Sequence, residues 1–373
     1  MSEADTALPQ PRTPPRTGLT IGVEEEFLLV DATSGELVPI AHAVLDGSEA
    51  YGLDLQAEMT RYQVESATAV CRTTDEVRDQ LLAGRRALTG LAARHGARIV
   101  ATGAPVRGGR RPPPLTDEPR YHRIETEFGA LVDGLTICGC HVHVGLPDEQ
   151  AGVLISNHLR QWLPVLLALS ANSPFFEGRD TGYASWRYLA WSLWPSAGPP
   201  PWLDSVEDYR QATRALLASG AALDEAMVYW DVRLSARHPT VELRVCDVMA
   251  TAEEAVLLAA LVRGLAAVAV AGVPAHRVPD RVLRAALWRS ARDGLEGAAL
   301  DVRTGQPVPA VDAVRALVDL TRPALREAGD EALVDDGVRK LLLDGTGAAR
   351  QRRAVLMAAA PQTAARPPGS RLC

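Results

Sequence analysis

Three consecutive carboxylates interrupt a segment that otherwise has the composition of a buried strand. Residues 20–31 read TIGVEEEFLLVD, with the acids at positions 24–26. Burying an ionised carboxylate is unfavourable unless a cation or hydrogen-bond donors meet it. Because side chains alternate across a strand, Glu24 and Glu26 share one face, roughly 7 Å apart, while Glu25 faces the other way. Two hard oxygen donors at that separation suit Mg²⁺ ions that carry phosphates; the alternative is an exposed strand with solvated acids.

Three further predicted strands carry charged side chains on faces whose other residues are small. The hydrophobic patterns place these strands at residues 63–70, 135–145 and 240–248. Each strand alone has an ordinary explanation, such as satisfied histidines or a solvated cross-strand pair. If the strands share one sheet, their charged faces converge on one concave surface. The converging residues are Glu24, Glu26, Glu65, His141, His143, Glu242 and Arg244.

A surface of this composition fits phosphoryl transfer, in which positioning and electrostatic stabilisation do most of the catalysis. Carboxylates hold Mg²⁺, and arginine binds a phosphate through two parallel hydrogen bonds. Glu58 precedes Glu65 by seven positions, so on one continuous strand it would face the opposite side. A bulge or loop must intervene if both contribute, and Glu58 therefore ranks below the other acids.

The composition argues against nucleic acid and membrane partners. The 373 residues are 47% hydrophobic and 23% charged, which fits an ordinary globular protein. The net charge of −7 offers no basic surface for a polyanion. Residues 255–272 are strongly apolar, but Arg263 interrupts them, which favours a core helix over a membrane span.

Cysteine and lysine usage limits the chemistry further. The five cysteines are an odd number without a CxxC pair, which is typical of reduced thiols and predicts a cytoplasmic location. Lys340 is the only lysine among 39 basic residues. A Walker loop, a Schiff-base enzyme and a protein kinase each need a lysine at a motif position. Nucleotide phosphates would therefore have to be bound by arginine and metal.

The remaining patterns predict one large domain. They indicate helices at 74–95, 119–132 and 148–171, strands at 97–103 and 230–235, a long loop at 171–204, and mainly helices from 251 to about 359. The loop is too long to be a mere connector. We therefore expect a disordered N-terminal arm at 1–18, a single domain at 19–359 with a helical C-terminal part, and a flexible tail at 360–373.

Six motifs occur in order along the chain. They are GVEEEF at 22–27, QVE at 63–65, CGCHVHVG at 138–145, ANSPF at 171–175, GRDTGYAS at 178–185 and TVELR at 240–244. This set resembles the type 2 glutamate–cysteine ligase family, and within it the YbdK-like carboxylate-amine ligases. The resemblance runs from about residue 18 to 359. It departs at Thr68-Ala69, where the family tends to have Thr-Pro, and at Cys246, where a small or apolar residue is usual.

The resemblance implies an α+β, glutamine-synthetase-like fold, in which a curved, mainly antiparallel sheet forms a funnel backed by helices. It also implies an ATP-dependent ligase that uses Mg²⁺ or Mn²⁺. The family's metal ligands fall on Glu24, Glu26, Glu65, His141 and Glu242 of this chain, and its phosphate-contacting catalytic arginine falls on Arg244. His143, Arg179, Tyr183 and Arg187 are candidates for binding nucleotide or substrate, with loop packing as the alternative for the last three.

The activity that follows from the resemblance is amide formation through an acyl phosphate. ATP would phosphorylate a carboxylate, the γ-carboxylate of glutamate in the family, and an amine would then attack. The family name suggests cysteine as the amine, although no residue of this sequence can be assigned to recognising the cysteine side chain. A homodimer is compatible with these expectations. Two alternatives stay open: a metal-dependent amidohydrolase, because His-x-His also serves such sites, and a non-catalytic nucleotide-binding relative.

Overall fold

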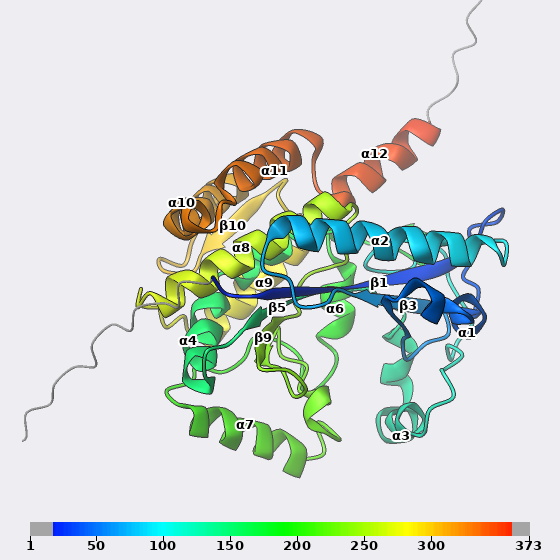
Figure 1. The fold of residues 1–373 in the computed structure, drawn as a ribbon, viewed down its shortest axis with the longest axis horizontal. Coiled ribbons are helices and arrows are strands. Elements are labelled where there is room, and N and C mark those ends of the chain that lie inside the picture. The colour runs from blue at the N-terminus through cyan, green and yellow to red at the C-terminus, as the bar shows by residue number, and fades with distance from the viewer. Residues whose placement is uncertain (1–17, 360–373) are drawn as a thin grey trace, which may run out of the picture.

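The computed structural model describes residues 18–359. The predicted N-terminal arm, apart from Gly18, and the predicted tail at 360–373 lie outside the described residues. Within the described range the chain forms one central sheet with helices on both sides (Figure 1). The division into a single domain with two terminal arms stays a prediction.

The central sheet has seven strands, and every pair of neighbouring strands in it is antiparallel. The order is β2-β3-β1-β5-β9-β8, and β4 pairs with the far end of β1. The strands are β1 (Ile21–Asp31), β2 (Asp54–Ala57), β3 (Gln63–Ala67), β4 (Ala97–Val100), β5 (Cys140–Gly145), β8 (Val232–Leu234) and β9 (Thr240–Leu243). They are shorter than the sequence patterns predicted. Strand β2 was not predicted, because its four residues alternate between exposed and half-buried positions.

The register of these strands places charged residues side by side. Glu24 lies opposite His141 on β5, and Glu26 lies opposite Glu65 on β3. His143 lies opposite Glu242 on β9. Directly opposite residues in an antiparallel pair have Cβ atoms about 5 Å apart, so the sheet itself gathers these side chains.

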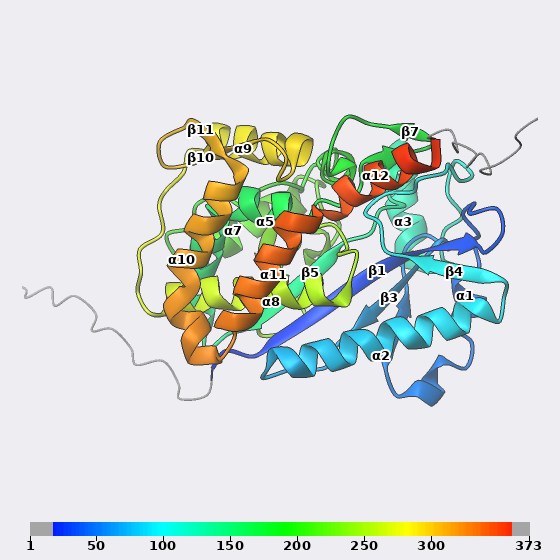
Figure 2. The ribbon, with the colours of Figure 1, turned by 90° about the horizontal axis from the view of Figure 1, so that it is seen from above.

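Two long helices cover one face of the sheet. These are α2 (Thr74–Ala93) and α8 (Ala252–Val270), which lie across β1 and β5 (Figures 1 and 2). Each begins with a capping box, formed by Thr73 and Glu76 in α2 and by Thr251 and Glu254 in α8. Such boxes satisfy backbone N–H groups that a helix start leaves unpaired. The buried sides of both helices join the apolar face of the sheet in the largest core cluster.

A second helical layer lies on α8. Helix α10 (Ala310–Ala328) and α11 (Glu331–Asp344) pack against α8, and α12 (Gly347–Ala359) continues along the same side (Figure 2). Helix α9 (Asp280–Asp293) packs against α5 (Leu163–Ser170). The predicted run of helices after residue 251 is interrupted by a hairpin, β10 (Ala298–Asp301) and β11 (Gln306–Pro309).

The remaining elements lie around the central sheet and its covering helices. The predicted helix at 148–171 is two helices, α4 (Glu149–Arg160) and α5, because the chain breaks at Gln161 and Trp162 just before Pro164. The predicted 171–204 loop holds a hairpin and a short helix. The other elements are α1 (Ala41–Leu45), α3 (Pro119–Phe128), β6 (Phe175–Phe176), β7 (Arg179–Asp180), α6 (Trp186–Trp191), α7 (Val206–Ala218) and 3-10 helices at Ser48–Tyr51, Gly129–Gly134 and Glu225–Met227.

The predicted α+β class with a mainly antiparallel sheet backed by helices is confirmed. None of the helices between residues 18 and 359 combines the length and apolarity needed to cross a membrane. Residues 255–270 of this apolar stretch form most of α8, which is buried in the core. The four cysteines in the described range, Cys71, Cys138, Cys140 and Cys246, are buried free thiols.

Candidate active site

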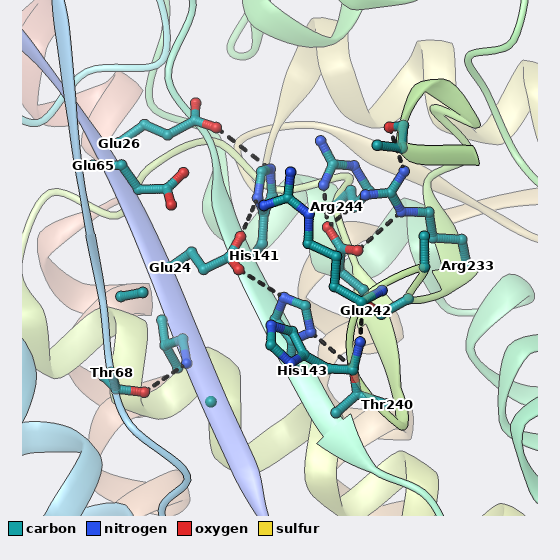
Figure 3. A pocket seen from close by; sticks show the side chains of 18 of the residues that line it. Glu24, Glu26, Glu65, Thr68, His141, His143, Arg233, Thr240, Glu242 and Arg244 are labelled. Atoms are coloured by element: carbon teal, nitrogen blue, oxygen red, sulfur yellow. Dashed lines mark hydrogen bonds and ion pairs between the residues drawn. The ribbon is translucent and has the colours of Figure 1, made fainter. Parts of the chain in front are cut away.

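The face of the sheet opposite α2 and α8 borders a cavity of about 850 Å³. Charged side chains from β1, β3, β5 and β9 point into it (Figure 3). The four predicted charged strand faces therefore converge on one surface. Because β1 is central, it contributes Glu24 and Glu26 to the middle of this surface.

Glu24 is held between two histidines. Its Oε2 lies 3.1 Å from His141 Nδ1, and its Oε1 lies 3.0 Å from His143 Nε2. The Nδ1 atom of His143 is 2.9 Å from the hydroxyl oxygen of Thr240. Each imidazole is therefore oriented through Nδ1, which leaves its Nε2 facing the carboxylates, as in histidines that bind metals.

One group of possible ligand atoms lies on the β9 side of the cavity. Glu24, His143 and Glu242 each offer one atom, and these atoms lie within 4.8 Å of one another. Glu242 is buried and accepts hydrogen bonds from two arginines. Arg233 donates from Nε to Oε2 at 2.9 Å, and Arg244 donates from Nη1 to Oε1.

A second group lies on the β3 side. Glu26, Glu58 and Glu65 each offer an oxygen within the same 4.8 Å limit. The sequence analysis required a bulge or loop between Glu58 and Glu65 if both were to contribute, and the structure has one, because residues 54–67 form the β2–β3 hairpin rather than one continuous strand. Glu58 follows β2 directly, so the connection to β3 returns its carboxylate to the face that Glu65 occupies.

In the second group, burial and repulsion between neighbouring carboxylates raise the pKa of Glu26 and of Glu65. The pKa of Glu26 is raised to about 8, first by burial and then by the neighbouring charge of Glu58, against the opposing effect of Arg187. The pKa of Glu65 is also well above its usual value, through burial and then the charges of Glu58, Glu24 and Glu26. Like charges that crowd a buried space disfavour ionisation, and a divalent cation among them would relieve this repulsion.

In the first group, the pKa of both carboxyl groups is lowered rather than raised. Burial raises the pKa of Glu24, but hydrogen bonds from His141 and His143 outweigh it, and the net pKa is lowered. Glu242 likewise has a lowered pKa, because the charges of Arg244 and Arg233 overcome its burial. Burial, then the charge of Arg244, lowers the pKa of His141 to about 4. His141 is therefore neutral at pH 7 and its Nε2, which is buried without a hydrogen-bond partner, keeps a lone pair for a metal.

Comparisons with known proteins identify the family. The model of glutamate-cysteine ligase family 2 (GCS2) matches residues 20–373. This chain belongs to glutamate–cysteine ligase family 2. That family comprises ATP-dependent ligases, so the predicted class of carboxylate-amine ligase is confirmed and the amidohydrolase and non-catalytic alternatives are not favoured.

Curated relatives cover nearly the whole chain. A protein of Saccharopolyspora erythraea that carries the provisional name glutamate–cysteine ligase 2-1 is 50% identical over 336 residues, covering 90% of this chain and 89% of the relative. A Salinispora arenicola protein provisionally named glutamate–cysteine ligase 2 is 48% identical over 346 residues, covering 91% of each.

Solved structures share the fold at low sequence identity. The glutamate–cysteine ligase of Francisella tularensis, crystallised in complex with AMP, is 14% identical with a TM-score of 0.65, covering 91% of this chain and 85% of that one. A bifunctional glutathione synthetase from Pasteurella multocida gives 15% identity and a TM-score of 0.64, covering 93% of this chain and 51% of that one.

Of the candidates in the long loop, only Arg187 lines the cavity. Arg179 is exposed on β7, outside the cavity lining. The Tyr183 hydroxyl accepts a hydrogen bond from Trp288 Nε1 at 3.3 Å, also outside the lining. The structure therefore does not bring Arg179 and Tyr183 to the site, because the β6–β7 hairpin carries them to the outer side of the loop.

Several lining residues were missed by the sequence patterns. Arg233 was detectable, since it lies directly opposite Glu242 in a predicted antiparallel pair. Arg120, Trp191 and Tyr229 carried no signal, because they come from segments whose position depends on packing. Trp191 and Tyr229 pack against each other at an interplanar angle of 45° with ring centroids 4.5 Å apart, and they form an aromatic wall of the cavity.

Proposed function

We propose that this ligase transfers the γ-phosphoryl group of ATP to the γ-carboxylate of glutamate and joins the resulting acyl phosphate to an amine. The names of the curated relatives make cysteine the first amine to test. One observation carries the proposal: two groups of ligand atoms share the Glu24–Glu26 face of β1 and have a buried arginine, Arg244, beside them. A carboxylate and a triphosphate need this combination of cation sites and guanidinium.

The two groups fit divalent cations such as Mg²⁺ or Mn²⁺. Glu24, Glu242 and His143 would hold one ion, and Glu26, Glu58 and Glu65 would hold another; the Nε2 of His141 faces Glu26 from 3.8 Å. Oxygen and imidazole ligands suit these ions, and the second group has no basic residue among its members. When bound, the cations would offset the repulsion between carboxylate and phosphate.

Arg244 would stabilise the transferring phosphoryl group. One of its nitrogens is fixed on Glu242, and its buried Nε has no hydrogen-bond partner. Arg233 holds the other side of Glu242 and so keeps that carboxylate from rotating. A guanidinium fixed in advance can stabilise transition-state charge without reorganisation when the reaction occurs.

Formation of the acyl phosphate would make the carbonyl carbon electrophilic, and inorganic phosphate would leave when the amine attacks. This route needs no covalent nucleophile from the protein. Cys138 and Cys140 are not suited to act as such a nucleophile. Burial raises the pKa of both thiols well above the usual value and keeps them protonated.

The test is ADP formation with ATP, Mg²⁺ and glutamate against a panel of amino acids and amines, with mass spectrometry of the product. We expect one amide per ADP, formed only when acid and amine are both present. The Glu242→Gln variant serves as the inactive control. A wild-type enzyme that forms no ADP with any acid and amine pair, or that cleaves amides without ATP, would contradict the proposal.

A further inference from the structure

The second half of α12 stands away from the rest of the molecule. Residues 347–352 are buried or half-buried, whereas residues 353–358 are all exposed. Because about 3.6 residues complete one turn of a helix, these six successive residues point in every direction around the helix axis. This part of α12 is therefore open to solvent on all sides, and Figure 1 shows it running out beyond the helices beneath it.

The open part of α12 is apolar. It reads AVLMA at 354–358, and the exposed fractions of Val355, Leu356 and Met357 are 50%, 70% and 74%. A short helix is marginal in water unless its apolar side chains pack against something. Adjacent large apolar side chains on a protein surface also mark sites of interaction. We therefore expect another surface to cover this segment in solution.

The parts of the chain outside the described residues are a poor cover for it. Leu8 is the only branched aliphatic or aromatic residue in 1–17, and Leu372 is the only one in 360–373. One leucine from either segment does not match three adjacent large apolar side chains. The cover therefore comes from another chain.

The charge pattern of α12 suits a second copy of the same helix. Arg350, Arg352 and Arg353 precede the apolar segment, and residues 347–359 contain no acid. The C-terminal end of a helix carries partial negative charge on its unpaired carbonyl groups. If two copies pack antiparallel about a two-fold axis at Leu356, position 353 of one copy lies beside position 359 of the other. Each Arg353 then meets the negative end of the opposite helix, whereas a parallel pair would bring like charges together.

The β6–β7 hairpin extends this surface. Arg352 Nε and Nη2 donate to the carboxylate of Asp180 on β7 at 2.8 and 2.7 Å, and Nη2 donates to the carbonyl oxygen of Tyr183 at 2.9 Å. Arg179, next to Asp180, is exposed. A stable interface buries about 800 Å² on each partner, which is more than three side chains provide. The hairpin beside α12 supplies additional area and a further positive charge.

The first half of α12 connects this surface to the cavity. Gln351 Nε2 donates to Asn172 Oδ1 at 2.8 Å, and the backbone N–H of Asn172 donates to the buried carboxylate of Asp247 at 2.8 Å. The chain from Asn172 leads into α6, which carries Arg187 and Trp191 to the cavity lining. An interface that holds α12 in place therefore also supports this side of the cavity.

We infer that two copies of this chain associate through the second half of α12, packed antiparallel about a two-fold axis, with the β6–β7 hairpin at the rim of the interface. The same patch serves on both subunits, as a two-fold interface requires. Val355, Leu356 and Met357 of each copy form the apolar centre, and Arg353 lies at its edge.

Sedimentation velocity of the full-length protein over a range of concentrations tests the association. Leu356→Glu is the test variant, because the side chain is exposed in the single chain and glutamate is a good helix former. Leu154→Glu on α4 is the matched control, since Leu154 is also an exposed leucine on a helix. Arg353→Glu tests the antiparallel arrangement. Thermal unfolding checks that each variant is folded.

We expect the wild type to form a dimer and Leu356→Glu to raise its dissociation constant by about 10²-fold or more, because the substitution places two carboxylates together at the apolar centre. Arg353→Glu should raise the dissociation constant by about tenfold, through repulsion by the opposite helix end. Leu154→Glu should match the wild type. By hydrogen exchange, the amides of 353–358 should be more protected in the wild type than in Leu356→Glu.

Three results would overturn the inference. The first is a wild type that stays monomeric up to its solubility limit. The second is a Leu356→Glu dimer as tight as the wild type, which would place the interface elsewhere. The third is a monomer whose amides at 353–358 are already protected, which would mean that another part of the same chain covers the helix. None of these results bears on the ligase reaction, which ADP formation measures separately.

Discussion

Arg85 and Glu25 form an ion pair on the face of β1 opposite the cavity. Arg85 Nε donates to Glu25 Oε2 at 2.8 Å, and Nη2 donates to Oε1 at 2.5 Å. Nη2 also donates to the carbonyl oxygen of Met249 at 2.8 Å. The middle acid of the three therefore has a structural partner in α2, whereas its two neighbours point toward the cavity. The pair also ties β1 to the segment that precedes α8.

We expect loss of this pair to affect stability rather than chemistry. Glu25→Ala should lower the free energy of unfolding by about 3–5 kcal/mol, because it leaves the largely buried Arg85 without its counter-ion. Denaturant unfolding measures this effect. Replacing both residues, as Glu25→Leu with Arg85→Met, should recover part of the loss. A single variant as stable as the wild type would show that the pair is not stabilising.

Removal of divalent cations should abolish ADP formation, because carboxylate oxygens, with the imidazole of His143 in the first group, supply the possible ligands of both groups. Excess chelator, followed by titration with Mg²⁺ or Mn²⁺, is the measurement. In direct binding by calorimetry, Glu26→Gln and Glu24→Gln should each weaken cation binding. Full turnover in excess chelator would reject the metal assignment of both glutamates.

Arg244→Lys should lower kcat by about 10² or more while weakening ATP binding only modestly. The variant keeps the charge and loses the planar fork that contacts Glu242 and, in our proposal, the phosphoryl group. Steady-state kinetics with varied ATP separates the two effects. If kcat stays near normal and only KM for ATP rises, Arg244 binds the ground state and its transition-state role is wrong.

Cys138 and Cys140 should be replaceable without loss of metal. Both are fully buried in the core clusters, away from the cavity lining. The double Ala variant should lose roughly 1–3 kcal/mol of stability, mainly through lost packing. Metal content by elemental analysis should equal that of the wild type. A drop in bound metal would mean that β5 presents its other face to the cavity in solution.

His158 should make stability fall at mildly acidic pH. Burial lowers its pKa to about 4, and its Nδ1 has no hydrogen-bond partner. Between pH 6.5 and 4 only the unfolded chain binds this proton, so stability decreases as the pH falls through that window, by up to about 3 kcal/mol. Above pH 6.5 the contribution is zero. Urea unfolding of His158→Gln should show a shallower pH slope than the wild type, and equal slopes would contradict the assignment.

The sequence alone determined on which face of its strand each candidate side chain lies. It placed Glu24 and Glu26 on one face and Glu25 on the other, and it separated His141 from Cys140 in the same way. This succeeds because the direction of a side chain on a strand is a local property of the backbone with a period of two. The family motifs then gave the fold class and the reaction class.

The tertiary structure decided which residues outside the long strands reach the cavity. Glu58 joins the acids only because β2 and β3 fold back on each other, and no local pattern specified that turn. Arg187 enters the site and Arg179 does not, although both belong to one loop, because Asp247 anchors one end of that loop. Side-chain direction in loops depends on such long-range contacts, whereas the sequence alone specifies only the local periodicity of strands and helices.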